Sequence, residues 1–140
     1  MRCTFLLLIL SMVFNVLAQD PVIVIYSTVP DRLPFEVSLF LDAKAMYAAP
    51  LHKNKKLIYS CKTTGHRVLL AKSLNAPNVR SATKEINVTA NDTLYFNLGG
   101  YGKVGESGHD SIYLIDITDD QKQRSKLNKK EFVAVLSRED

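Results

Sequence analysis

Beyond position 20, apolar residues fall into short runs in which hydrophobic and polar positions alternate, separated by polar or Gly- and Pro-containing breaks. A period of two is typical of β-strands that bury one face. We expect strands over residues 22–27, 37–41, 45–49, 57–61, 67–73, 84–89, 93–98, 111–118 and 132–136. The pattern predicts an all-β chain, a single antiparallel β-sandwich of six to eight strands or a small barrel.

The breaks predict how these strands connect. Residues 42–44 are turn-like and indicate a first hairpin, and the turn 62–65, with Gly65 to supply a positive φ, indicates a second pair between 57–61 and 67–73. We expect residues 90–92 to form the turn between the strands over 84–89 and 93–98. Residues 111–118 are mostly apolar on both faces, so we expect a central strand there.

One short helix is expected near the C-terminus. Thr118 begins a Thr-x-x-Gln sequence that resembles a capping box, and two acidic residues follow it, which suits the positive end of a helix dipole. We therefore expect a helix from Asp119 to about Lys126.

The first nineteen residues have the pattern of a secretory signal peptide. Arg2 precedes an apolar run that continues to Leu17 and ends at Ala18-Gln19, where cleavage is expected. The run is shorter than the roughly 20 residues that span a bilayer, which disfavours the alternative of an uncleaved anchor. We predict a signal peptide over 1–19 and one domain over 20–140, secreted or periplasmic, with no transmembrane segment in the mature chain.

The charge balance of the chain is mildly basic. Its formal net charge is +4, and loss of Arg2 with the signal lowers this to +3. Lysines gather in two segments, but no aromatic residues interleave with them as they do on a base-stacking surface. We interpret both groups as solvated faces and expect no nucleic-acid partner; their members are Lys53, Lys55, Lys56, Lys122, Lys126, Lys129 and Lys130.

The mature chain has one cysteine, because Cys3 belongs to the predicted signal. It cannot form an internal disulfide, although an odd thiol in an exported protein could pair between chains. Cys61 ends an apolar run, where a small buried hydrophobe is its ordinary role. A thiol enzyme in which Cys61 and His66 face each other across their turn is an alternative. Since the sequence shows neither an oxyanion site nor a pocket, we predict no enzyme.

The segment 99–110 is the most suggestive candidate site, with five glycines. The spacing Gly100-x-Gly102-x-x-Gly105 matches a dinucleotide fingerprint, but that motif requires a following helix and we expect a strand. No cofactor is therefore predicted. We expect a long flexible connection, with partner binding as its functional alternative, through Gly99, Gly100, Tyr101, Gly102, Lys103 and His109.

Other chemistry-bearing residues are scattered. The histidines His52, His66 and His109 lack ligand-like spacing, even with Asp110 beside the last, so no metal site is predicted. Two sequons begin at Asn87 and Asn91. In a eukaryote Asn91, at a turn, would be the better glycosylation acceptor, and Asn87 the lesser one.

A family resemblance rests on Val37-x-Leu39-x-Leu41-Asp42-Ala43-Lys44, on Pro50, and on Gly65-His66-Arg67-Val68-Leu69-Leu70. These elements resemble the PEGA type of envelope domain and a related family of small exported β-domains of unknown function in bacterial lipoproteins and periplasmic proteins. Ile86-Asn87-Val88 and Leu94-Tyr95-Phe96 extend the likeness. The chain departs from the pattern at Ala43, where Gly is usual, and lacks a lipid-anchor cysteine.

The resemblance implies a β-sandwich and a binding or structural role in the cell envelope, with no catalytic residues and a bacterial source. Together with the signal and the strand pattern, it leads us to expect a non-enzymatic module whose partner is an envelope or extracellular protein or glycan. A carrier of a small apolar ligand is the alternative, and the thiol enzyme is the second alternative.

Overall fold

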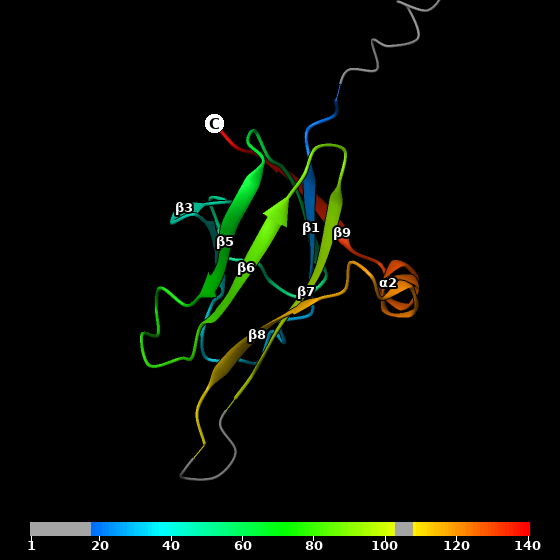
Figure 1. The fold of residues 1–140 in the computed structure, drawn as a ribbon. Helices are drawn as coiled ribbons and strands as arrows, with labels where there is room; N and C mark the ends of the chain where they lie inside the picture. Colours follow the sequence, from blue (N-terminus) through cyan, green and yellow to red (C-terminus); the bar gives the residue numbers. More distant parts are fainter. Residues whose placement is uncertain (1–17, 103–107) are drawn as a thin grey trace, which may run out of the picture.

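A computed structural model describes residues 18–102 and 108–140. Within these residues it contains nine strands and one helix (Figure 1). In chain order they are β1 (Val22–Ser27), β2 (Ser38–Leu41), β3 (Lys44–Ala45), β4 (Lys55–Ser60), β5 (Gly65–Lys72), β6 (Ala82–Val88), β7 (Thr93–Tyr101), β8 (Ser111–Asp116), α2 (Gln121–Asn128) and β9 (Val133–Arg138).

The strands form two sheets. Sheet A has the order β8-β7-β1-β4-β9, and sheet B has the order β3-β2-β5-β6. Sheet B is antiparallel throughout, whereas β1 pairs with β7 and β4 pairs with β9 in parallel within sheet A. Figure 1 shows sheet B on one side of sheet A and α2 on the other side. The fold is therefore a sandwich with a helix against its outer surface.

The core lies between the two sheets, where alternate residues of each strand point inward. On β5, for example, Leu69 and Ala71 are buried, while Leu70 and Lys72, which alternate with them, are half-buried. The largest fully buried side chains are Phe96, Ile23, Ile25, Leu39, Leu41, Met46, Leu51, Leu57, Leu69, Leu98, Ile117 and Val37. Burial of such side chains stabilises the fold by roughly 1.5–3 kcal/mol each, and no disulfide contributes among the described residues.

A second, smaller apolar cluster joins α2 to the outer face of sheet A. Leu127 of the helix packs with Val24, Tyr26 and Ile117. The Tyr26 hydroxyl donates a hydrogen bond to Asn128 Oδ1 at 2.5 Å, and Phe132 meets the Tyr26 ring edge-on at 5.2 Å between centroids. Both faces of β1 are consequently buried, which explains its uninterrupted apolar sequence.

The predicted fold class is confirmed: the chain is an all-β sandwich with one short helix near the C-terminus. The expected strand over 45–49 is wrong in extent, since β3 covers only Lys44–Ala45. Two pairings in sheet A are parallel, where an antiparallel sandwich was expected. The hairpin about residues 42–44 forms between β2 and β3, and Asp42 and Ala43 there have φ of 48° and 67°.

Two expected strand pairs are wrong. β4 lies in sheet A and β5 in sheet B, so the turn at 62–65 carries the chain between sheets instead of closing a hairpin. The turn at 90–92 does the same between β6 and β7. Gly65 still has a positive φ of 111°, as expected. The alternation of apolar and polar residues specifies which face of a strand is buried. A strand buries that same face whether it forms a hairpin with its neighbour in sequence or lies in the opposite sheet.

The expectation of a central strand over 111–118 is also wrong, since β8 is at the edge of sheet A. The connection between β5 and β6 protects that edge: Arg80 donates its N–H to the Asp110 carbonyl at 2.9 Å and accepts from the Ile112 N–H at 2.8 Å. An edge strand covered in this way can be apolar on both faces without exposing its backbone N–H and C=O groups to another chain.

The helix forms two residues later than expected, with a different cap. Asp120 is the N-cap, and its side chain accepts a hydrogen bond from the Gln123 N–H at 2.9 Å. Thr118, expected to cap the helix, accepts from the Tyr95 N–H of β7 at 3.0 Å. The final strand forms as expected, as β9.

Candidate functional site

The glycine-rich segment is the end of a long hairpin. β7 and β8 pair from Phe96 opposite Asp116 to Tyr101 opposite Ser111. Gly99, Gly100 and Tyr101 therefore belong to strand β7, and the expected connection begins only at Gly102. Figure 1 shows this hairpin extending beyond the body of the sandwich.

Within the described part of the chain, the predicted site residues between β7 and β8 are Gly102 and His109. His109 is exposed and lies two residues before the start of β8. Lys103 lies outside the described residues. The first described element after the glycine pattern is the strand β8, whereas a dinucleotide fingerprint requires a helix N-terminus.

Gly99 and Gly100 lie on opposite faces of β7, and each allows a neighbouring side chain to come close to the strand. At Gly99, an added Cβ would overlap ring atoms of Tyr113, so this ring lies directly across the strand. At Gly100, a Cβ would lie 3.1 Å from Leu33 and 3.3 Å from Phe35 on the core side. The glycines are explained by close packing, since neither has the positive φ that favours glycine.

Apolar side chains gather on the outer face of this hairpin. Gly99 pairs with Tyr113 and Asn97 with Ile115, and directly opposed residues share a face. Tyr101 follows on the same face because strands alternate. Its ring lies 6.3 Å from that of Tyr113, with 28° between the planes. We call Tyr101, Tyr113 and Ile115 the hairpin face.

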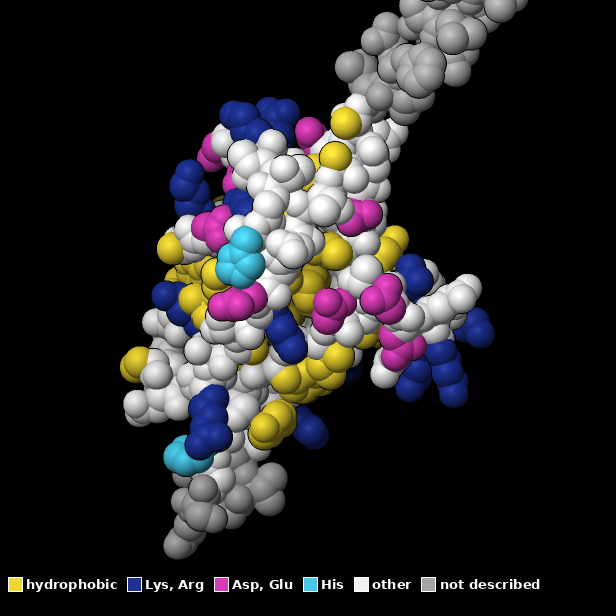
Figure 2. Space-filling model, viewed as in Figure 1, with side chains coloured by type: hydrophobic (Ala, Val, Ile, Leu, Met, Phe, Trp, Pro, Cys, Tyr) yellow, Lys and Arg dark blue, Asp and Glu magenta, His cyan; other side chains and the backbone are white. Residues whose placement is uncertain are grey.

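The hairpin face is open to solvent. Tyr101 is 55% exposed and Ile115 is 47% exposed, while Tyr113 is half-buried. Figure 2 shows hydrophobic side chains at the surface close to the grey hairpin tip. Two exposed large apolar residues beside a third on one strand pair make a contiguous patch, unlike the single exposed Leu74 in the β5–β6 connection.

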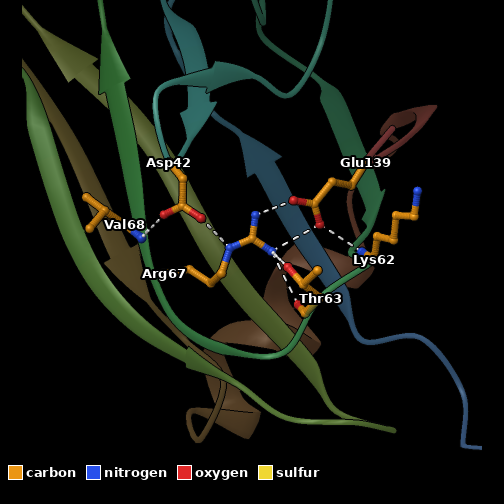
Figure 3. A network of polar contacts seen from close by, with 6 residues as sticks. All are labelled: Asp42, Lys62, Thr63, Arg67, Val68 and Glu139. Carbon is orange, nitrogen blue, oxygen red and sulfur yellow. Dashed lines mark hydrogen bonds and ion pairs between the residues drawn. The ribbon is translucent and has the colours of Figure 1, made fainter.

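The most perturbed ionisable groups surround Arg67, near the start of β5 (Figure 3). Arg67 lies on the inward face of β5 and is only 6% exposed. Its Nε donates to Asp42, its Nη2 donates to Glu139, and its Nη1 donates to Glu139 at 3.0 Å and to the Thr63 hydroxyl at 2.8 Å. We call Arg67, Asp42 and Glu139 the Arg67 triad.

The Arg67 triad joins both sheets. Asp42 follows β2 of sheet B, and Glu139 follows β9 of sheet A. Asp42 Oδ1 also accepts from the Val68 N–H at 2.9 Å, and Glu139 Oε2 from the Lys62 N–H at 2.8 Å. Sequence reasoning missed the triad because its members are 25 and 72 residues apart. The turn at Asp42 and the Gly-His-Arg sequence that contains Arg67 are the sequence features that point to two members of the triad.

Charge pairing explains the titration of the triad. The side-chain hydrogen bond from Arg67 lowers the pKa of Glu139 to about 2, against the opposing effect of burial. The backbone hydrogen bond from Val68, followed by Arg67, lowers the pKa of Asp42. The two carboxylates in turn raise the pKa of Arg67, mainly through the hydrogen bond to Glu139. All three groups are charged at neutral pH, and their function here is to hold the two sheets and the C-terminus together.

The structure does not bring Cys61 and His66 together. Cys61 is 1% exposed and belongs to the core, and burial raises the pKa of its thiol to about 11. His66 lies on the outward face of β5, where its Nε2 is 3.6 Å from Glu85 Oε2. The expected burial of Cys61 is confirmed. Its thiol is protonated and enclosed at neutral pH.

The remaining predicted residues lie at the surface. Asn87 is exposed on β6, and Asn91 is exposed in the turn before β7 with φ of 64°. Asn91 Oδ1 accepts from the Gln19 N–H at 2.6 Å. Across 18–102 and 108–140, no group of three or more His, Cys, Asp or Glu residues is placed to hold a metal ion. Over the same ranges, no helix has the length and hydropathy needed to cross a membrane.

Comparisons with family models, with curated proteins and with solved structures give no match to this chain. The resemblance to PEGA-type domains therefore stays a prediction.

Proposed function

We propose that this chain is an exported, non-enzymatic binding module whose hairpin face contacts an extracellular or envelope partner. The observation that carries the proposal is the exposed pair of nearly parallel rings, Tyr101 and Tyr113, extended by Ile115. Tyrosine presents a large apolar body with a polar tip at a low entropic cost, which is why it is enriched in binding hot spots.

The hairpin suits this role mechanically. Its base is paired on one side to β1 of sheet A, and its inward residues Phe96 and Leu98 are fully buried. The exposed rings are thus fixed to a rigid scaffold, so that binding would cost little further ordering. Gly99 keeps the Tyr113 ring down against the strand, which orients the surface that a partner would meet.

Export is supported by the sequence pattern of residues 1–19, and an envelope role by the PEGA-type resemblance. The thiol-enzyme alternative loses support, because the Cys61 thiol is buried and protonated and His66 pairs elsewhere. The carrier alternative would need an apolar cavity, and its candidate is a cleft of about 330 Å³ lined in part by Val29, Phe35 and Leu51 of the core.

Affinity capture under cross-linking tests the proposal. The mature chain is immobilised and exposed to the envelope and extracellular fractions of its source, and captured protein and glycan are identified by mass spectrometry. We expect a partner that the intact chain captures and that Tyr101→Ser loses, because the substitution removes the most exposed ring of the hairpin face.

Leu74→Ser is the matched control. Leu74 is 67% exposed, lies in the β5–β6 connection and is not part of the hairpin face. Capture should survive this substitution. Equal capture by the intact chain and by Tyr101→Ser, or equal loss with both variants, would exclude the hairpin face as the contact surface.

A further inference from the structure

The two lysine-rich segments, which the sequence separates by more than sixty residues, converge at one end of sheet A. β4 and β9 run in parallel, so their N-terminal ends lie side by side, with Lys55 opposite Val133. The Val133 N–H donates to the Asn54 carbonyl at 2.7 Å. Lys53 and Lys130, which precede these strands, are consequently brought to the same place.

A third cation comes from the connection that follows β1. The end of β1 adjoins the start of β4, where the Asn54 N–H donates to the Ser27 carbonyl at 3.0 Å. Arg32 lies five residues beyond the end of β1. Arg32, Lys53 and Lys130 line one surface cleft of about 540 Å³, which we call the basic cleft.

The residues that line the basic cleft carry a net positive charge. Asp31 is the acidic residue among those that line it, against three cations. Among the described residues, none of the ion pairs within 4 Å involves Arg32, Lys53 or Lys130. All three are exposed. Three cations from separate segments, directed at one concavity without their own counter-charges, create a local positive potential that attracts an anion.

The other lining residues indicate what kind of anion would fit. The Asn54 side chain supplies a neutral hydrogen-bonding group, and Phe132 supplies a half-buried apolar wall, whereas the Thr28 hydroxyl is already engaged with Asn97 and Leu98. A volume of about 540 Å³ is in the range of small-ligand sites, roughly 300–1,000 Å³. Arginine and lysine are the ordinary partners of sulfate and phosphate groups.

We propose that the basic cleft is a second binding site, separate from the hairpin face, for a saccharide that carries sulfate or phosphate esters. The tetrahedral oxyanion meets Arg32, Lys53 and Lys130, and a sugar ring lies against Phe132. A nucleic-acid strand fits less well, since Phe132 is the one aromatic ring among the lining residues and no second ring continues a stacking surface in the cleft. A flat anionic membrane fits less well because the cations surround a concavity.

Calorimetric titration of the full mature chain tests this site. The probes are a heparin-derived hexasaccharide, inorganic phosphate, and vesicles of phosphatidylserine and phosphatidylcholine. We expect saturable binding of the hexasaccharide, competed by phosphate at high concentration. The triple substitution Arg32→Gln, Lys53→Gln and Lys130→Gln should weaken it by at least about tenfold, the equivalent of one lost charged hydrogen bond.

A control of equal net charge separates a site from general attraction. It carries Lys44→Gln, Lys84→Gln and Lys122→Gln, which remove three exposed lysines elsewhere, and it should bind within about threefold of the unsubstituted chain, as distant charges are screened by salt. Equal loss in both triples, absence of hexasaccharide binding, or binding to the vesicles alone would overturn the proposal. Tyr101→Ser leaves the basic cleft intact. A failure of the proposed saccharide site can therefore be distinguished from a failure of partner binding at the hairpin face.

Discussion

Substitution of Glu139 by Gln tests the Arg67 triad with minimal change in shape. Glu139 accepts from Arg67 through both carboxylate oxygens and from the Lys62 N–H. Gln removes the negative charge and keeps one acceptor oxygen. Arg67, which is buried, then retains Asp42 as its remaining carboxylate partner. The chain should stay folded but become less stable, because a buried charge has lost half of its compensation.

The magnitude follows from the titration of Glu139. Its pKa falls from an ordinary 4.5 to about 2 in the folded chain. Each pKa unit corresponds to about 1.4 kcal/mol, so the interactions of the ionised form contribute roughly 3–4 kcal/mol at neutral pH. For a domain of this size, a loss of that order lowers Tm by about 10 °C.

The dependence on pH has a definite sign. Because the folded pKa is depressed, the stabilisation is fully present above pH 4.5 and is lost as pH falls toward 2. Chemical unfolding between pH 7 and pH 3 should show this decline in the unsubstituted chain and a shallower one in Glu139→Gln. The control is Glu85→Gln, which removes an exposed carboxylate beside His66 and should change stability by less than about 0.5 kcal/mol. Equal stabilities of Glu139→Gln and Glu85→Gln at pH 7 would refute the reasoning.

Three further results are expected. Gly99→Ala should destabilise the chain by about 1–3 kcal/mol through overlap with Tyr113, and combining it with Tyr113→Ala should recover part of the loss in chemical unfolding; full stability of Gly99→Ala would contradict the packing. Cys61 should resist iodoacetamide in the native state and react after denaturation, and rapid native labelling would contradict its burial. Leu127→Ala should cost about 2 kcal/mol and release α2, seen as lost helical circular dichroism, whereas an unchanged spectrum would contradict the packing of the helix.

Local pattern predicted the strands well because burial of one face leaves a period of two in the sequence. On β2 and β5, the positions that alternation assigns to the interior are the buried ones, except that Arg67 occupies one of them. The turn at Asp42 and the burial of Cys61 were also predictable, since each depends on its immediate neighbours.

Pairing between distant segments was not predictable in the same way. The parallel alignment of β4 with β9 joins residues almost eighty positions apart, and nothing in either strand specifies the other. That alignment creates the basic cleft, so two lysine groups that looked like separate solvated faces meet in space. The Arg67 triad escaped prediction for the same reason.

The hairpin segment shows how structure changes the meaning of a motif. Its glycines suggested a flexible connection, but Gly99 and Gly100 are strand residues that admit Tyr113 on one side and Leu33 on the other. Tyr101 was singled out as a contact residue from its place in that segment, and it is exposed. Whether it contacts a partner stays a prediction.

Site-specific photo-cross-linking tests the central claim most directly. A benzophenone amino acid replaces Tyr101 in one variant and Leu74 in another, and each is irradiated in the envelope and extracellular fractions of the source. The account predicts a discrete cross-linked species from position 101 and none from position 74, with unlabelled mature chain competing for the first. The same products from both positions, or none from position 101, would contradict it.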